Sequence, residues 1–259
     1  MTRVPALLLV VAACRSTPID VLARATWVDL SYAFDSTTIY WPTAQPFKLE
    51  VVSAQRTPGG WYYAANNFAA AEHGGTHLDA PVHFGEGQQT TDRIPLEHLT
   101  GPAIVIDTRG AADADRDYLI SAGDLTQWEQ SHGPIPAGAI VLLRTGRGAF
   151  WLDRARYLGT TRTGPAAVAE LHFPGVDPAA ARLLVDRHID AVGIDTPSID
   201  RGQSTTFETH QVFAAANVPI FENVAHLDRV PPTGAFAIGL PMKIGGGSGG
   251  PLRLVAVVP

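Results

Sequence analysis

Short runs of apolar, often β-branched residues alternate with turns along most of the chain. Residues 103–107 read AIVID and residues 139–144 read AIVLLR, and glycine or proline residues lie close to both runs. Continuous apolar runs of this length predict strands that are buried on both faces. Comparable patterns predict strands at residues 26–30, 47–52, 191–195, 235–244 and 252–258.

Two segments carry the signals of helix N-termini instead. Ser121 precedes a segment that runs to His132, and Asp124 stands at the reciprocal position of a capping box. Asp177 and Pro178 can form the N-cap and first turn of a second helix, which would continue through residue 187. Because predicted strands outnumber predicted helices and no linker divides the chain, we expect a single domain of mixed α/β or α+β class.

Composition agrees with a packed domain and removes several classes of function. Hydrophobic residues make up 46% of the 259-residue chain and charged residues 17%, which argues against disorder. The net charge is −6 and no basic cluster occurs, so we expect no nucleic-acid partner. A single cysteine excludes an internal disulfide and a CxxC zinc site. No apolar run reaches the ~18 residues of a membrane-spanning helix.

The first fourteen residues, MTRVPALLLVVAAC, have the layout of an export signal. Arg3 precedes a short apolar run, and two alanines precede Cys14. The ending resembles the lipobox of bacterial lipoproteins, in which the cysteine carries the lipid. We therefore expect residues 1–13 to be a lipoprotein-type signal peptide and the protein to be exported and lipid-anchored at the cell envelope. A frayed or buried N-terminal segment and a cytoplasmic protein are the alternative.

The strongest chemical signal is the segment EHGGTHLDAPVHF at residues 72–84. Its polar residues His73, His77, Asp79 and His83 all have odd numbers, so one extended segment would point them to the same face. The glycines and the proline between them argue against a helix. Because imidazole and carboxylate groups together bind Zn, Mn or Fe, this segment predicts a divalent metal site.

Other polar and aromatic groups receive less specific interpretations. The glycine run at residues 245–250 lacks the Lys-Ser/Thr of a P-loop, and we expect a plain connection without fixed side chains. For Asp195 and Asp200 we favour a role in a turn over a role beside the metals. The aromatic residues at positions 61–63 and Phe68 could line a substrate pocket or pack in a core or an interface.

Residues 73–84 resemble the signature H-x-G-T-H-x-D-x-P-x-H-F of the cyclase-like metal-dependent hydrolases, the family of bacterial kynurenine formamidase and isatin hydrolase. The likeness extends across the mature chain and implies a cyclase-like hydrolase domain over residues 14–259. The fold it implies is a mixed α/β single domain, with a strand-rich, swivelling β/β/α-type barrel-like core and a few flanking helices.

The resemblance also implies the roles of individual residues. The spacing between His210 and Glu222 is the family's, so both are expected beside the metal. Asp79 and Glu222 would then bridge two metals. The implied metal ligands are His73, His77, Asp79, His210 and Glu222. His83 would be the catalytic histidine and not a ligand, and Trp41 would pack on the substrate.

These roles imply a metal-dependent amidohydrolase that acts on a small aryl formamide such as N-formylkynurenine. We expect about two divalent ions per chain, Zn or Mn, and a homodimer or larger assembly. The isatin hydrolase branch works with a single manganese, so the pair His210 and Glu222 favours the formamidase arrangement. An isatin-type cyclic amide hydrolase and a non-catalytic, metal-binding exported lipoprotein are the alternatives.

Overall fold

The structure is a computed structural model that describes residues 22–259. The predicted signal peptide and Cys14 lie outside the described residues. Among the described residues, no helix combines the length and the apolar composition needed to cross a membrane.

The strands and helices follow in this order along the chain. The strands are β1 (Thr26–Asp29), β2 (Lys48–Arg56), β3 (Tyr62–Ala69), β4 (His77–Asp79), β5 (Thr100–Asp107), β6 (Leu119–Ile120), β7 (Ile140–Arg144), β8 (Gly175–Val176), β9 (Ala191–Ile194), β10 (Ile220–Glu222), β11 (Ala235–Pro241) and β12 (Gly249–Val258). The α-helices are α2 (Arg109–Ala114), α3 (Ala122–His132), α4 (Arg154–Leu158), α5 (Pro178–Asp186) and α6 (Glu208–Ala215).

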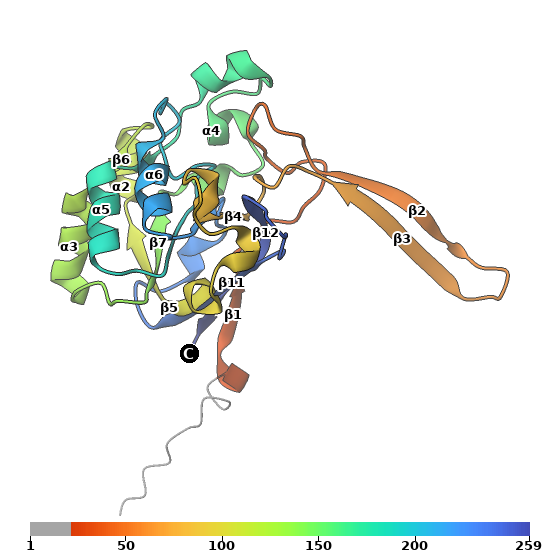
Figure 1. The fold of residues 1–259 in the computed structure, drawn as a ribbon, viewed down its shortest axis with the longest axis horizontal. Helices are drawn as coiled ribbons and strands as arrows, with labels where there is room; N and C mark the ends of the chain where they lie inside the picture. The colour runs from red at the N-terminus through yellow and green to blue at the C-terminus, as the bar shows by residue number, and fades with distance from the viewer. Residues whose placement is uncertain (1–21) are drawn as a thin grey trace, which may run out of the picture.

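A closed β-barrel forms the centre of the domain (Figure 1). Its strands follow the order β12-β11-β5-β7-β9-β10-β4, and the pairing of β4 with β12 closes the ring. The strands β5, β7, β9 and β10 run parallel to one another, and the remaining neighbours are antiparallel. The expected mixed α/β single domain with a barrel-like core and a few helices is confirmed.

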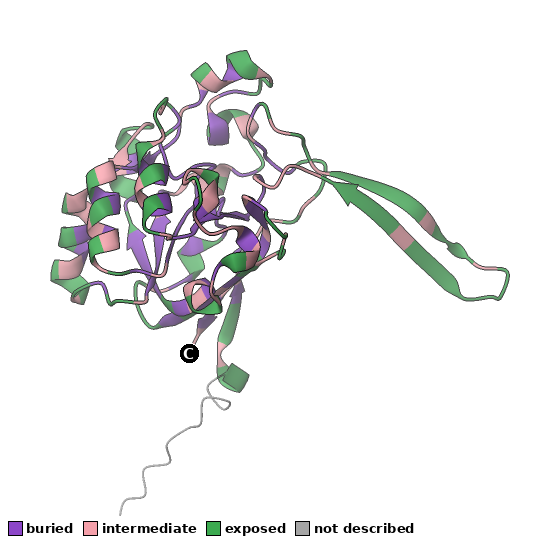
Figure 2. Ribbon diagram, viewed as in Figure 1, coloured by how far each residue is buried: buried purple, intermediate pink, exposed green. Residues whose placement is uncertain are grey.

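The barrel strands bury both of their faces, as their continuous apolar sequences predict. Val105 and Leu142 belong to the cluster that fills the barrel interior. Their neighbours Ile106 and Leu143 belong to a second cluster, which packs under the helices α3 and α5. The buried strands therefore lie at the middle of the molecule, between the interior cluster and the helical layer (Figure 2).

The two predicted helices form as α3 and α5, whereas α2, α4 and α6 were not predicted. Ser121 caps α3 through a capping box, in which the Ser121 hydroxyl accepts from the backbone N–H of Asp124. Asp177 caps α5, with a proline at the first position. The helix α6 begins after Phe207, which has a left-handed backbone and offers no side-chain cap. Without a capping signal in the sequence, this helix went unpredicted.

The strands β2 and β3 pair with each other as a long hairpin that projects from the barrel (Figure 1). We call this hairpin, residues 48–69, the arm. The predicted strand at residues 47–52 is therefore confirmed, but it belongs to the arm and not to the central sheet. A bulge between Val51 and Ser53 interrupts the pairing.

Candidate metal centre

The antiparallel pair β4 and β10 provides the floor of the site. His77 lies opposite Glu222 in this pair. Leu78 and Phe221 point into the barrel interior. Because successive side chains of a strand alternate between faces, His77, Asp79 and Glu222 point to the outer face, next to α6. The strand alternation that the sequence predicted is therefore confirmed for His77 and Asp79.

Residues 73–83 do not form the single extended segment that would align all four polar residues, because the chain turns at both ends of β4. Gly75 takes a left-handed backbone, with φ +59°, so the chain turns between His73 and β4. After β4 the chain enters a 3₁₀ turn, Pro81–His83, with the proline at its start. The turns still bring the ends together, because the rings of His73 and His83 stack with centroids 3.8 Å apart.

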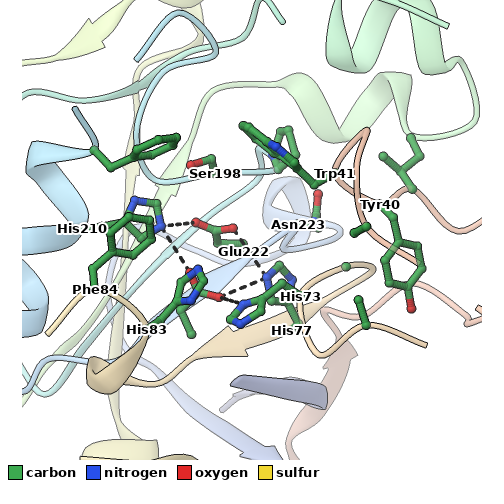
Figure 3. Close-up of a pocket in the computed structure, with 17 residues that line it drawn as sticks. Tyr40, Trp41, His73, His77, His83, Phe84, Ser198, His210, Glu222 and Asn223 are labelled. Atoms are coloured by element: carbon green, nitrogen blue, oxygen red, sulfur yellow. Dashed lines mark hydrogen bonds and ion pairs between the residues drawn. The ribbon is translucent and has the colours of Figure 1, made fainter. Parts of the chain in front are cut away.

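The helix α6 brings His210 to the same place from a distant part of the sequence. His210 Nε2 lies 3.2 Å from Asp79 Oδ2 and 3.3 Å from Glu222 Oε1. His73 Nδ1 lies 2.7 Å from Asp79 Oδ1. All five residues expected as metal ligands therefore line one cavity. Figure 3 shows His73, His77, His210 and Glu222 gathered there, with His83 beside them.

The chemistry of this donor set fits a divalent cation. His77 Nε2 is buried and has no hydrogen-bond partner within residues 22–259, although Asp79 Oδ1 is 3.1 Å away. His77 Nδ1 lies 3.0 Å from the carbonyl oxygen of Gly75 and donates its hydrogen there, which leaves Nε2 available as a ligand. A cation would also balance the buried carboxylates.

Two overlapping groups of donors are close enough to hold an ion. One group is His77, Asp79 and Glu222, and the other is His73, Asp79 and His83. Asp79 is common to both groups, in agreement with its expected bridging role. The second group contains His83, so geometry alone permits this histidine either as a ligand or as a free catalytic group.

Burial and neighbouring charges change the acidity of the central groups. Burial would raise the pKa of Asp79, but the surrounding histidines, His73 first among them, hold it well below its usual value. Burial and the nearby Asp79 charge raise the pKa of Glu222. Burial lowers the pKa of His83 to about 4. Burial thus keeps the His83 imidazole neutral at neutral pH and makes it a weaker base than an exposed histidine.

Asp200 has a role beside the metal centre, which was the less favoured interpretation of the sequence. Its carboxylate accepts hydrogen bonds from His210 Nδ1 at 2.6 Å and from the His210 backbone N–H at 3.1 Å. The bond from Nδ1 places the ring hydrogen on that nitrogen, so that Nε2 faces Asp79 and Glu222. Asp195 does serve a turn, since it accepts from the backbone N–H groups of Thr145 and Gly146 at 2.8 Å each.

Ser248 also contacts the centre, and the expectation of a connection without fixed side chains is wrong at this position. Its hydroxyl lies 2.9 Å from His73 Nε2 and donates to Glu72 Oε2 at 2.6 Å. Gly249 is required beside it, because a Cβ there would lie 2.6 Å from Cε1 of the His73 ring. A serine within a glycine run carries no sequence signal for this contact, which depends on the closure of the barrel.

A cavity of about 320 Å³ opens over the donors, and aromatic side chains line it. Trp41 lies in its wall and meets the Phe207 ring edge-on, with centroids 6.5 Å apart. Phe84 also lines the cavity (Figure 3). The aromatic residues at positions 61–63 and Phe68 do not line it, because they lie on the arm.

Comparisons with known proteins agree with this site. The model of the Cyclase family, described as "Putative cyclase", matches residues 28–201. Isatin hydrolase of Roseibium aggregatum is 35% identical over 208 residues, which cover 77% of this chain and 77% of that protein. Kynurenine formamidase of Salinibacter ruber is 29% identical over 228 residues, which cover 88% of this chain and 95% of that protein.

Solved structures share the fold over nearly the whole chain. Isatin hydrolase A from Ralstonia solanacearum matches with a TM-score of 0.83 and 34% identity, over 96% of this chain and 100% of that one. A protein from Bacillus stearothermophilus described as "predicted metal-dependent hydrolase" matches with a TM-score of 0.66 and 26% identity, over 91% and 99% of the two chains. From its signature, its fold and these relatives, the chain belongs to the cyclase-like family of metal-dependent hydrolases.

Proposed function

We propose that this protein hydrolyses an amide bond of a small aromatic substrate and uses divalent metal as its cofactor. The observation that carries the proposal is that one cavity combines the five candidate ligands with an aromatic wall. Relatives in the family are an isatin hydrolase and a kynurenine formamidase, and both names denote hydrolysis of an amide on an aromatic compound.

A divalent metal bound at this centre would activate water and polarise the carbonyl oxygen of the substrate. The ligands would be His73, His77, Asp79, His210 and Glu222. His83, whose ring stacks on that of His73 beside the centre, would take a proton from the attacking water and pass it to the leaving nitrogen. Trp41 and Phe84 would hold the aromatic ring by apolar contact and exclude water from the reacting carbonyl.

An isatin-type cyclic amide is the first candidate substrate. Isatin hydrolases are the relatives with the higher identity and the higher structural similarity among those described above. In a cyclic amide, the carbonyl carbon and the leaving nitrogen both remain attached to the ring system. The aromatic wall beside the donors suits a flat, fused ring of this kind.

An aryl formamide is the second candidate, and a specific contact pattern favours it. Glu222 places Oε2 3.6 Å from His77 and Oε1 3.3 Å from His210, so its two oxygens face different histidines. Asp79 is arranged in the same way, with Oδ1 towards His73 and Oδ2 towards His210. Carboxylates that face histidines on two sides would allow two ions per chain, the number expected for a formamidase-like enzyme.

The proposal is tested with a substrate panel on protein loaded with Zn or with Mn. Isatin, formanilide and acetanilide are compared by kcat/KM. Hydrolysis of isatin above all others supports the cyclic-amide candidate, and a preference for formanilide supports the formamide candidate. If the loaded protein binds metal but hydrolyses none of these amides, the proposal fails and a non-catalytic metal-binding protein takes its place.

The variant Trp41→Ala tests substrate binding separately from the chemical step in the same assay. An apolar contact acts on the substrate and the transition state alike, so Trp41→Ala should raise KM and leave kcat nearly unchanged. A fall in kcat with unchanged KM would place Trp41 outside the substrate-binding wall.

We further propose that the protein is exported and lipid-anchored through Cys14. A lipid chain contributes roughly 0.8 kcal/mol per buried CH₂ to membrane binding. Cys14→Ser should therefore move the protein from the membrane fraction to the soluble fraction. An intact mass that still includes Met1, measured on protein from its native host, would reject the signal peptide.

A further inference from the structure

A second cavity, of about 490 Å³, lies beside the cavity of the metal centre. The two share part of their lining, since Tyr40, Trp41 and Ala44 belong to both. Prolines and threonines form most of the remaining lining, and Arg154 is the one formally charged residue of the described chain that lines it. A largely apolar cavity with a single cation in it suits an organic anion.

Arg154 lacks the partners that a half-buried guanidinium usually has. Its Nε is buried and forms no hydrogen bond within residues 22–259. Its Nη2 lies 3.5 Å from the carbonyl oxygen of Tyr40, a long contact. Burial alone lowers the pKa of Arg154, and no neighbouring carboxylate acts against it. A buried N–H and a half-buried charge are thus left without compensation, which costs free energy.

Other arginines of the domain show what such compensation looks like. Arg147 is also partly buried, but it donates to the carbonyl oxygens of Arg156 and Arg116 at 3.1 and 3.3 Å. Arg187 forms a two-pronged pair with Glu129, at 2.8 and 2.9 Å. The missing partner of Arg154 is therefore a feature of its cavity and not of arginines in this fold.

We propose that this second cavity binds a small aromatic carboxylate, whose carboxylate group pairs with Arg154. The planar guanidinium matches a carboxylate with two parallel hydrogen bonds, and Nε is one of the donors suited to that pairing. Trp41 and the prolines would pack on the ring. A phosphate carries a charge of about −1.5 to −2, which one guanidinium in an apolar cavity balances poorly.

The chemistry of amide hydrolysis suggests where such a ligand comes from, and this link rests on the proposed function. Hydrolysis breaks the C–N bond, places the oxygen of water on the carbonyl carbon and moves a proton to the nitrogen. From a cyclic aryl amide, the product carries both an amine and a carboxylate on one aromatic molecule. The shared wall at Trp41 would let a product held by Arg154 contact the substrate cavity.

Calorimetric titration with benzoate tests the binding without any turnover. We expect wild-type, metal-loaded protein to bind benzoate, and Arg154→Gln to weaken the affinity by at least about tenfold. The matched control is Arg156→Gln, on the same helix α4, where the guanidinium is exposed and stacks over Phe150 at 3.8 Å. The control should bind benzoate as the wild type does.

Two further titrations keep the test decisive if Arg154→Gln fails to fold. Benzamide has the same ring without the charge, so it should bind wild-type protein much more weakly than benzoate. Benzoate should also still bind after chelation of the metals, because its site contains none of the metal ligands. Equal affinity for benzamide, equal affinity of Arg154→Gln, or loss of benzoate binding on chelation would overturn the proposal, whether or not the amidohydrolase assignment stands.

Discussion

The metal centre and the arm reverse the usual relation between polarity and burial. Asp79, His210 and Glu222 are charged or polar, yet their exposed fractions are 3, 4 and 3%. Val51 and Tyr62 on the arm are large and apolar or aromatic, yet they are 64 and 62% exposed. Figure 2 shows most of the arm in the colour of exposed residues. Each region therefore lacks something that the single chain does not supply.

The two regions lack different things. Two carboxylates buried beside histidines are costly without a cation, so the centre requires a metal. An exposed apolar surface is costly in water, so we expect the arm to have an apolar cover. The first requirement is confined to a few donor atoms, whereas the second extends along the hairpin, and we propose that another protein surface meets it.

The arm has a preferred face for such a cover. Leu49 pairs with Phe68, and Val51 pairs with Asn66 on the same face, while Glu50 and its partner lie on the other face. A two-stranded hairpin is marginally stable by itself in water. The homodimer expected from the sequence would cover this face, and we expect a second copy of the chain to pack there.

The largest effect should follow from removing a central ligand. His77→Ala should lose metal and with it nearly all activity, because His77 contacts both Asp79 and Glu222. Elemental analysis and kcat measure the two losses. His132→Ala is a suitable control, since His132 lies on α3 away from the cavity. Full activity after thorough chelation would show that the buried centre does not need a metal.

The next largest effect concerns His83, which lies beside the ligands. General acid–base groups typically contribute ~10²–10⁴-fold to the rate. His83→Ala should lower kcat by that range while the metal content stays that of the wild type. Metal loss equal to that of His77→Ala would instead make His83 a ligand, in line with the geometric group that contains it.

Most of the residues of the metal centre could be predicted from the sequence. Strand alternation placed His77 and Asp79 on one face, and the family resemblance added His210 and Glu222 from across the chain. Asp200 and Ser248 were not assigned to the centre, because their contacts depend on tertiary closure. Ser248 is separated from His73 by 175 residues and reaches it only because β12 pairs with β4.

A smaller effect should follow from weakening the support of a ligand. Asp200→Asn keeps the shape of the side chain but weakens the bond to His210 Nδ1. Loss of such a partner typically costs ~10–100-fold in metal affinity or activity. Competition with a fluorescent chelator measures the affinity directly. Asp195→Asn, which alters a turn bond away from the ligands, should leave metal affinity unchanged, and an equal loss in both variants would indicate general destabilisation.

A substitution on the arm should have the smallest effect on the barrel and a large effect on the assembly of copies. Val51→Asp places a charge in the centre of the apolar face, and surface substitutions usually change the free energy of unfolding by less than about 0.5 kcal/mol. Light scattering should therefore report a lower molecular mass, while circular dichroism and metal content stay unchanged. Asn67→Asp puts the same charge on the opposite face of the hairpin and should leave the assembly intact. If Val51→Asp assembles like the wild type, the apolar face of the arm is not the contact between copies. The arm would then be tolerated as an exposed apolar surface, and only the metal centre would be incomplete as a single chain.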